Sequence, residues 1–302
     1  MTPAKRILAL LSCTILAACS QTQDNRGALP LAAGPVVASD NFYALLDGRA
    51  VEESPTQLQN DFGPAVAITP ATHGAWVARR TSLCHSMIQL LSPSPSVSFV
   101  PTGSVSDLAA SPDGRWLAYS RAGSTPDTQT EGGDCGPDSI VIRDLRTAAE
   151  RVWPGAAGGV SSLSWAPDSK RLVFQTAICC VGGTTLYELD TSTAPQSIER
   201  IPRLAGVSEI TGAAHDPTFA GNQILVLVDN PAGTSQDYRV ATTLGATVAL
   251  LQDAAVSLDA DASGQHLLVG LYGSPDSTGN LLWVNRGKDP VVLGRGYKDA
   301  RM

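Results

Sequence analysis

Short runs of alternating apolar and polar residues recur along this chain, each preceded by a cluster of Pro, Asp, Ser or Gly. The clearest copy reads Ser-Pro-Asp-Gly-Arg-Trp-Leu-Ala-Tyr-Ser-Arg, from Ser111 to Arg121. Proline presets φ for a turn, Asp or Ser can hydrogen bond to the nearby backbone, and Gly accepts a positive φ. Alternating β-branched and aromatic residues suit half-buried strands. The segment therefore predicts a β-hairpin.

The same pattern occurs five times in all. Its turns have as second residue Pro70, Pro112, Pro167, Pro217 and Ala262, so the intervals are 42, 55, 50 and 45 residues. Two further strands are predicted after each hairpin, such as Ser139–Leu145 and Arg151–Trp153 in the second unit. Four strands in a repeat of about 40 to 50 residues are typical of a β-propeller blade. We therefore expect an all-β fold.

The phrase at Ser111 also carries a family resemblance. It is similar to the WD40-like propeller repeat of the TolB family, which also occurs in the propellers of prolyl oligopeptidase-type enzymes. The unit at Ala166 matches well, and the resemblance covers roughly residues 63–294. The Trp-Asp pair of true WD40 repeats is missing, which disfavours that branch. Three units are degenerate copies, namely those at Thr69, Asp216 and Asp261.

The number of blades has two solutions in the sequence. Five units begin near residues 63, 103, 158, 206 and 254, and residues 42–49 predict an extra hairpin around Asp47-Gly48. A six-bladed ring would need inner strands from the C-terminus, where only residues 293–302 follow the fifth unit. We expect five four-stranded blades plus an N-terminal hairpin. The alternative is a six-bladed propeller with one incomplete blade.

The N-terminus has the pattern of an export signal. Lys5 and Arg6 precede an apolar run at residues 7–17 that is shorter than the roughly 20 residues of a membrane-spanning helix. The run ends in Leu-Ala-Ala-Cys at Cys19, which resembles the lipobox of bacterial lipoproteins. That resemblance implies a signal peptide over residues 1–18 and a diacylglyceryl group on Cys19. The alternative is an ordinary secretory signal that happens to contain a cysteine.

The rest of the chain divides into two predicted parts. Residues 19–40 are polar and rich in small side chains, which predicts a flexible tether, and residues 41–302 form the propeller. No later apolar run is long enough to span a membrane, so the lipid would be the contact with the membrane. Ser20 follows Cys19, in place of the Asp that resembles an inner-membrane retention signal. We expect the protein in the bacterial cell envelope, facing the periplasm or the exterior.

The charge of the chain excludes one class of partner. The formal net charge is −7, and removal of residues 1–18 takes away two basic and no acidic residues, which gives −9. Nucleic-acid binding needs clustered Lys and Arg to displace counterions. Because no such cluster is visible, we expect no nucleic-acid partner.

Four cysteines remain besides Cys13 and Cys19. All four fall between the second and third predicted strands of three consecutive units, and those connections lie on one face of a propeller. An exported protein meets an oxidising compartment, so we predict disulfides. Four cysteines allow three pairings, and the sequence does not choose among them. A metal site that includes His85 is disfavoured because no Cys-x₂-Cys pair is present. The four cysteines are Cys84, Cys135, Cys179 and Cys180.

No arrangement for nucleophilic catalysis is visible. A Gly-x-Ser-x-Gly motif is missing from the sequence, and we expect no hydrolase domain like that of the prolyl oligopeptidase relatives. Surface positions are expected for the four histidines, which are His73, His85, His215 and His266.

Three carboxylates could supply a cation site in the central channel. Asp107, Glu209 and Asp259 lie on predicted inner strands, and Ca²⁺ takes six to eight oxygen ligands. Asp259 lies three residues after the preceding valine, whereas the other two carboxylates lie two residues after theirs. The alternative interpretation is that these carboxylates are solvated or hydrogen bond to turns.

These patterns favour a lipid-anchored, extracytoplasmic β-propeller that acts as a non-enzymatic binding or scaffolding module. We expect it to use no cofactor, and to contact a protein or another envelope component through the face that bears the cysteine loops. The alternative is a metal-dependent propeller enzyme, lactonase-like or sugar-oxidising, with its site in the central channel. Fold-level analogy alone does not decide between them.

Overall fold

The computed structural model describes the strand-forming part of the chain and several of its connections. The described residues are 36–39, 43–46, 49–52, 65–71, 74–82, 84–91, 97–122, 138–156, 159–177, 184–210, 213–229, 238–251, 255–271, 280–286, 291–295 and 297–301. They form 23 strands and two 3₁₀ helices. Neither of these helices is long and apolar enough to cross a membrane. The predicted signal peptide and Cys19 lie outside the described residues.

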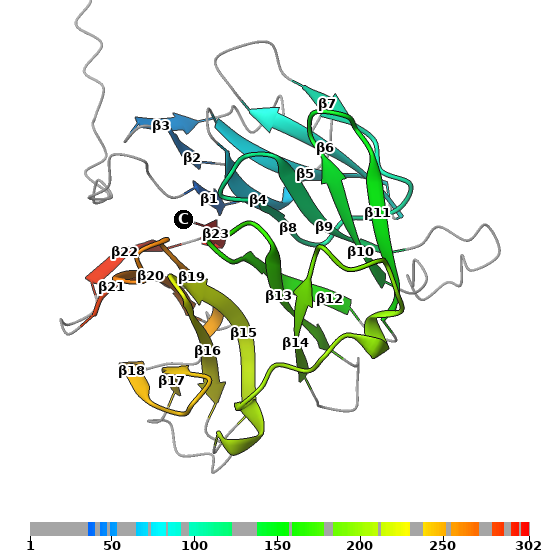
Figure 1. Cartoon of the computed structure of the whole chain (residues 1–302). Helices are drawn as coiled ribbons and strands as arrows, with labels where there is room; N and C mark the ends of the chain where they lie inside the picture. Colours follow the sequence, from blue (N-terminus) through cyan, green and yellow to red (C-terminus); the bar gives the residue numbers. More distant parts are fainter. Residues whose placement is uncertain are drawn as a thin grey trace, which may run out of the picture.

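Five small antiparallel sheets, each from one contiguous stretch of chain, lie in a ring (Figure 1). This confirms the all-β fold and the five predicted propeller blades. Blade 1 is β4 (Ala65–Ala71), β5 (Gly74–Ser82), β6 (His85–Leu91) and β7 (Ser98–Phe99). Blade 2 is β8 (Leu108–Ala110), β9 (Trp116–Ala122), β10 (Asp138–Asp144) and β11 (Glu150–Ala156). Blade 3 is β12 (Gly159–Trp165), β13 (Arg171–Ala177) and β14 (Thr184–Asp190). Blade 4 is β15 (Ala213–Ala220), β16 (Gln223–Asp229), β17 (Tyr238–Thr242) and β18 (Thr247–Leu251). Blade 5 is β19 (Ala255–Ala260), β20 (His266–Leu271), β21 (Asn280–Asn285) and β22 (Val291–Arg295).

The two ends of the chain form a further sheet between blade 5 and blade 1. Its strand order is β23 (Tyr297–Arg301), β1 (Val36–Ser39), β2 (Tyr43–Leu46) and β3 (Arg49–Glu52). Strands β2 and β3 pair over the segment for which a hairpin was predicted. One five-residue strand from the C-terminus is enough to join them to the ring, although the residues after the fifth unit were expected not to supply it. β1 lies at the end of the segment expected to be a tether.

Four strands per blade hold for blades 1, 2, 4 and 5, whereas blade 3 has three. The outer edge of β14 is instead bonded by the segment that follows it. Glu188 N–H donates to the carbonyl of Pro202 (3.2 Å), and Leu204 N–H donates to the carbonyl of Leu186 (2.8 Å). A short extended segment therefore replaces the fourth strand.

Three of the five predicted hairpin turns are confirmed, whereas those at Thr69-Pro70 and Asp216-Pro217 are wrong. Thr69 and Pro70 lie within β4 and pair with Trp76 and Ala75 of β5. The N–H groups of Gly114, Ser169 and Gly264 each close a turn by donating to a carbonyl three residues earlier. Asp216 and Pro217 instead lie inside β15, at a bulge where the register with β16 shifts. A bulge tolerates proline because the extra residue leaves the ladder of hydrogen bonds.

The blades bury their apolar faces against one another. Ile140 and Ile142 of β10 pack into a cluster with blade 3, whereas Val141, on the other face of the same strand, packs with blade 1. Similar clusters lie between blades 3 and 4 and between blades 4 and 5. Full burial of one such side chain stabilises the fold by roughly 1.5–3 kcal/mol. The alternation of the sequence thus places each strand between two neighbours.

Candidate binding pocket

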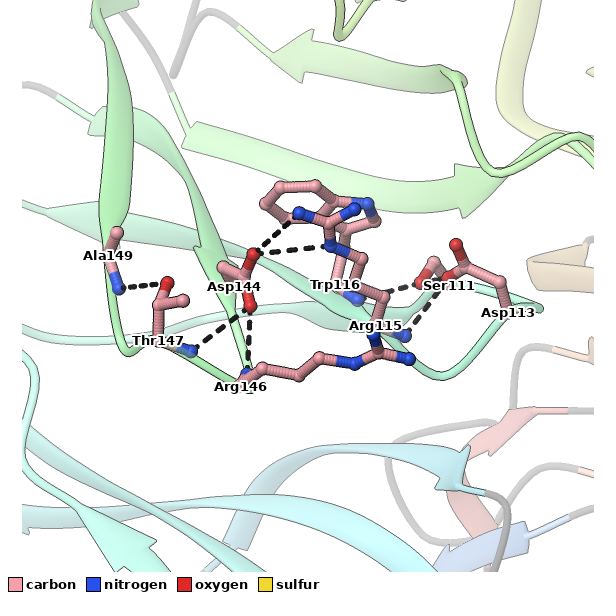
Figure 2. Close-up of polar contacts among 8 residues, drawn as sticks. All are labelled: Ser111, Asp113, Arg115, Trp116, Asp144, Arg146, Thr147 and Ala149. Carbon is pink, nitrogen blue, oxygen red and sulfur yellow. Dashed lines mark hydrogen bonds and ion pairs between the residues drawn. The ribbon is translucent and has the colours of Figure 1, made fainter.

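The repeated phrase at Ser111 forms a hairpin turn closed by its own side chains (Figure 2). The hydroxyl of Ser111 donates to Oδ1 of Asp113 (2.6 Å) and accepts from the N–H of Trp116 (2.9 Å). The same Asp113 oxygen accepts from the N–H of Arg115 (3.0 Å). Gly114 has φ 66°, the left-handed region that favours glycine. The residue types of the phrase are therefore those that the turn needs.

Asp144 joins this turn to the turn between β10 and β11. Its Oδ2 accepts from Nη2 and Nε of Arg115 (3.0 and 3.2 Å), and its Oδ1 accepts from the N–H groups of Arg146 (2.8 Å) and Thr147 (3.2 Å). The N–H of Arg146 and the guanidinium of Arg115 hold the pKa of Asp144 below its ordinary value. Figure 2 shows these contacts on one side of the blade. The two turns of blade 2 are thereby fixed on one face, the turn face.

Polar side chains of the inner strands bond one blade to the next. Oδ2 of Asp107 accepts from the N–H of Leu163 in blade 3 (2.8 Å). The hydroxyls of Ser164 and Thr218 lie 3.1 Å apart across blades 3 and 4, and Thr218 donates to Oδ1 of Asp259 in blade 5 (3.1 Å). The four polar side chains are buried, and buried polar groups are costly when they lack hydrogen-bond partners. These bonds set the relative height of the blades around the axis.

The three carboxylates proposed as cation ligands have different positions. Asp107 immediately precedes β8 and Asp259 lies in β19, as expected for inner positions. Glu209 was expected on an inner strand, and that prediction is wrong. It ends the 3₁₀ helix η2 (Val207–Glu209), which follows Gly206 at φ 81°, so the inner strand of blade 4 begins only at Ala213. In the described part of the chain, no group of three His, Cys, Asp or Glu side chains could hold a metal ion.

A pocket of about 910 Å³ opens on the turn face. Its rim includes Ala71, Pro112, Pro167 and Ala262, which flank or form first-hairpin turns of four blades. Its walls extend inward to the inner strands and across the junction of blades 1 and 2. The side chains on which the interpretation depends are Trp76, Val97, Phe99, Arg143, Asp259 and Asp261.

The charged side chains that line the pocket are one guanidinium and two carboxylates. Arg143 is engaged by Glu150 (Nη1 to Oε1, 2.8 Å), and its guanidinium lies 4.1 Å from the ring centre of Phe99. Asp259 and Asp261 contribute carboxylates from blade 5. Burial alone raises the pKa of Asp261, but hydrogen bonds from His266 and Ser263 outweigh it and bring the pKa below its ordinary value. Aromatic surface and carboxylates therefore meet in one cavity.

The strand ends that the cysteine-bearing connections join lie on the opposite face of the ring from this pocket. Cys84 occupies the turn between β5 and β6 and is disulfide-bonded. Cys135, Cys179 and Cys180 lie outside the described residues, so the pairing stays a prediction. They belong to the connections between β9 and β10 and between β13 and β14. These connections join the strand ends that point away from the turn face. The sequence analysis favoured that cysteine-bearing face for contacts, whereas the pocket opens on the turn face.

His215, which was expected at the surface, is largely buried. Its side chain is 16% exposed and lies between two carboxylates, with Nδ1 2.8 Å from Asp216 Oδ2 and Nε2 3.2 Å from Asp229 Oδ1. Burial alone lowers the pKa of His215, but the hydrogen bonds and charges of Asp216 and Asp229 outweigh it and raise the pKa.

Asp216 also links this histidine to blade 3. It accepts a hydrogen bond from the hydroxyl of Ser162, and its N–H donates to Oε1 of Gln175 (2.8 Å). The proline at position 217 was the only signal of an unusual backbone here, and it suggested a turn. His85 is exposed, as expected, and His266 is half-buried against Trp283. His73 lies outside the described residues.

Comparison with known proteins relates the chain to others through structure alone. No family model and no curated protein sequence matches it. It is similar to TolB from Acinetobacter baumannii, at 14% identity and a TM-score of 0.62, over 88% of this chain and 65% of that one. A putative TolB from Agrobacterium tumefaciens is similar at 14% identity and a TM-score of 0.57, over 82% and 85% of the two chains. The propeller domain of the Trilobed protease from Pyrococcus furiosus is similar at 14% identity and a TM-score of 0.52, over 80% and 76%.

This chain thus spans just under two thirds of the Acinetobacter TolB chain. At such low identity the similarity concerns the fold. Together with the five contiguous blades and the Ser111 turn, it identifies the architecture of this protein as a TolB-like β-propeller.

Proposed function

We propose that this protein is a lipid-anchored, extracytoplasmic binding module that holds a segment of another envelope component in the turn-face pocket. The pocket carries the proposal, because its volume of about 910 Å³ and mixed aromatic and carboxylate lining suit a bound segment. Ligand sites typically measure roughly 300–1,000 Å³ and combine apolar walls with a few polar groups. The proposed contact surface is therefore the turn face.

The charge of the pocket selects the kind of segment. Two carboxylates, Asp259 and Asp261, and one guanidinium, Arg143, line it, so the formal charge of its lining is negative, like that of the whole chain (−7). Complementary charge favours encounter and fixes orientation. The segment carries a basic side chain for the carboxylates, beside an apolar side chain for Trp76 and Phe99.

A binding role agrees with the chemistry of the polar cluster at His215. The Ser162 hydroxyl donates to Asp216, and His215 lies between Asp216 and Asp229. A serine nucleophile needs histidine as its base, with the carboxylate on the far side of the ring. The order found here is different, so this cluster is built to join blades.

The anchoring part of the proposal rests on the lipobox-like sequence at Cys19 and the apolar run at residues 7–17. Several acyl chains hold a protein at a membrane firmly, because each buried CH₂ contributes about 0.8 kcal/mol. Residues that precede the propeller then provide the spacer. The partner is accordingly expected within the envelope.

Two exposed valines give a matched test of the pocket. Val97 is 56% exposed and lines the pocket, whereas Val100 is 69% exposed and is not among its lining residues. Full-length protein is cross-linked in intact envelopes, captured, and its companions are quantified by mass spectrometry. We expect Val97→Asp to reduce a specific companion at least fivefold, roughly the effect of losing 1 kcal/mol of binding. Val100→Asp should leave it unchanged.

A third variant separates the anchor from the pocket. Cys19→Ala should release the protein from the membrane fraction while purified protein still binds the companion. The absence of any specific companion, or equal losses with the two valine variants, would contradict the pocket. Retention of Cys19→Ala in the membrane fraction would contradict the lipid anchor.

A further inference from the structure

The outer edges of the blades are protected in different ways. An outer strand presents unpaired N–H and C=O groups that can pair with another chain, and proteins usually block them. β7 has two residues, β11 carries Glu150, Arg151 and Pro154, and β14 is covered by the segment at Pro202 and Leu204. By sequence, β3 and β22 also contain charged residues.

Among the outer strands that the structure describes, β18 has no such protection. Its sequence is Thr-Val-Ala-Leu-Leu, without charge or proline, and it lies at the end of its sheet. Leu250 is 68% exposed, and Leu244, in the preceding turn, is 84% exposed. Figure 1 places β18 at the periphery of the ring, away from the axis. An apolar strand edge is thus open to solvent.

The backbone of β18 determines what can cover it. An extended strand satisfies the outward N–H and C=O groups, and apolar side chains on it would cover the exposed Leu250, whose partner on the inner side is Arg239 of β17. A second copy of β18 meets both conditions. The chain carries a formal net charge of −7, so two copies repel each other over much of their surface. Because β18 itself carries no charged side chain, two copies can approach along this edge without bringing like charges of the two strands together.

We propose that two copies of this protein associate through antiparallel pairing of their β18 strands. The arrangement uses the same strand from both copies about a two-fold axis, so it closes after two copies. Opposite residues in antiparallel strands share a face, which places Leu250 of each copy against the apolar face of the other strand. A five-residue strand buries much less than the roughly 1,000 Å² of a stable interface, so the dimer is weak and depends on concentration.

Sedimentation equilibrium of the full chain over a concentration series tests the proposal. Wild-type protein should shift from monomer to dimer, and Leu250→Lys should weaken the dimer about tenfold or more, because it places two ammonium groups in the paired edge. Val100→Lys is the matched control, since Val100 is 69% exposed in another blade. The control should dimerise like the wild type. Thermal unfolding of each variant establishes that the fold is intact.

Amide hydrogen exchange identifies the surface. The peptide that contains residues 247–251 should exchange more slowly at high protein concentration in the wild type, and at an unchanged rate in Leu250→Lys. A wild-type chain that stays monomeric throughout would overturn the proposal, including the case in which β18 pairs with a different protein. Dimerisation that Leu250→Lys does not weaken, or that Val100→Lys weakens equally, would also overturn it.

Discussion

Asp216 shows how one residue serves both its own strand and the next blade. It has φ 47°, in the left-handed region that non-glycine residues rarely adopt, and Ser162 has φ 57° at the bulge of the preceding inner strand. The hydroxyl of Ser162 donates to the carboxylate of Asp216. Each bulge turns a polar side chain toward the other, so the hydrogen bond between the blades offsets the cost of the two backbone conformations.

His215 makes this contact sensitive to pH. Because Asp216 and Asp229 raise its pKa in the folded state, the folded protein binds the proton more tightly than the unfolded chain. The stabilisation is fully present below the ordinary histidine pKa of about 6.5 and is lost as pH rises through the folded pKa. We expect the free energy of unfolding, from denaturant titrations at pH 5.5 to 9, to fall as the pH rises over this window.

The comparison with His215→Asn isolates the effect. This variant lacks the titrating ring and should lose the decline with pH, whereas His85→Asn, at an exposed position of blade 1, should keep it. A wild-type protein whose stability rises between pH 6 and 9, or a variant with an unchanged slope, would contradict the assigned role of His215.

At the scale of single elements, the hairpin turn of blade 2 contains most of its own determinants. Ser111, Asp113, Gly114 and Arg115 are adjacent in sequence, and their contacts with one another close the turn. Such a turn can be predicted from the sequence because no distant residue is needed. In blade 3, Ala166 takes the place of the serine, and Ser169, at φ 56°, takes that of the glycine.

Ser111→Ala tests this account. Ser111 is 4% exposed, and its hydroxyl bonds both Asp113 and the N–H of Trp116. Its removal should lower the free energy of unfolding by about 1 kcal/mol, the typical net value of a hydrogen bond. Denaturant unfolding measures the change. Ser263→Ala, in the exposed turn of blade 5, is the control and should change stability by less than about 0.5 kcal/mol. An equal effect of the two variants would assign Ser111 no special role.

Elements that depend on distant partners were predicted less well. Asp216-Pro217 has the composition of a turn, yet the N–H of Asp216 bonds Gln175 of another blade and the segment continues as a strand. Glu209 follows the same valine-serine pattern as Asp107 but belongs to a 3₁₀ helix. In both cases tertiary contacts or a glycine at positive φ override the local pattern, and one sequence does not reveal them.

At the scale of the whole molecule, the pocket and the ring closure have the same origin. The pocket walls come from Trp76, Phe99, Arg143 and Asp259, which are brought together only when the blades stack. No spacing in the sequence marks them as a set. The sequence did identify one of them, since Asp259 was predicted to be a carboxylate on an inner strand. The sheet that closes the ring likewise joins residues separated by most of the chain.

The strand β23 should therefore control the cooperativity of the fold. It pairs with β1 along Val36–Ser39 and lies against both β4 and β20, so it joins the two ends of the ring. Deletion of residues 297–302 removes this strand and leaves the neighbouring edges uncovered. We expect a melting temperature at least about 10 °C lower, as several kcal/mol would produce in a chain of this size, and a broader calorimetric transition. Deletion of residues 20–35, which precede β1, keeps every strand pair that the structure describes and should leave the transition unchanged. If the two deletion variants unfold alike, the stability of blades 1 and 5 does not depend on the sheet formed by the chain ends. The ring is then held together by its contiguous blades alone.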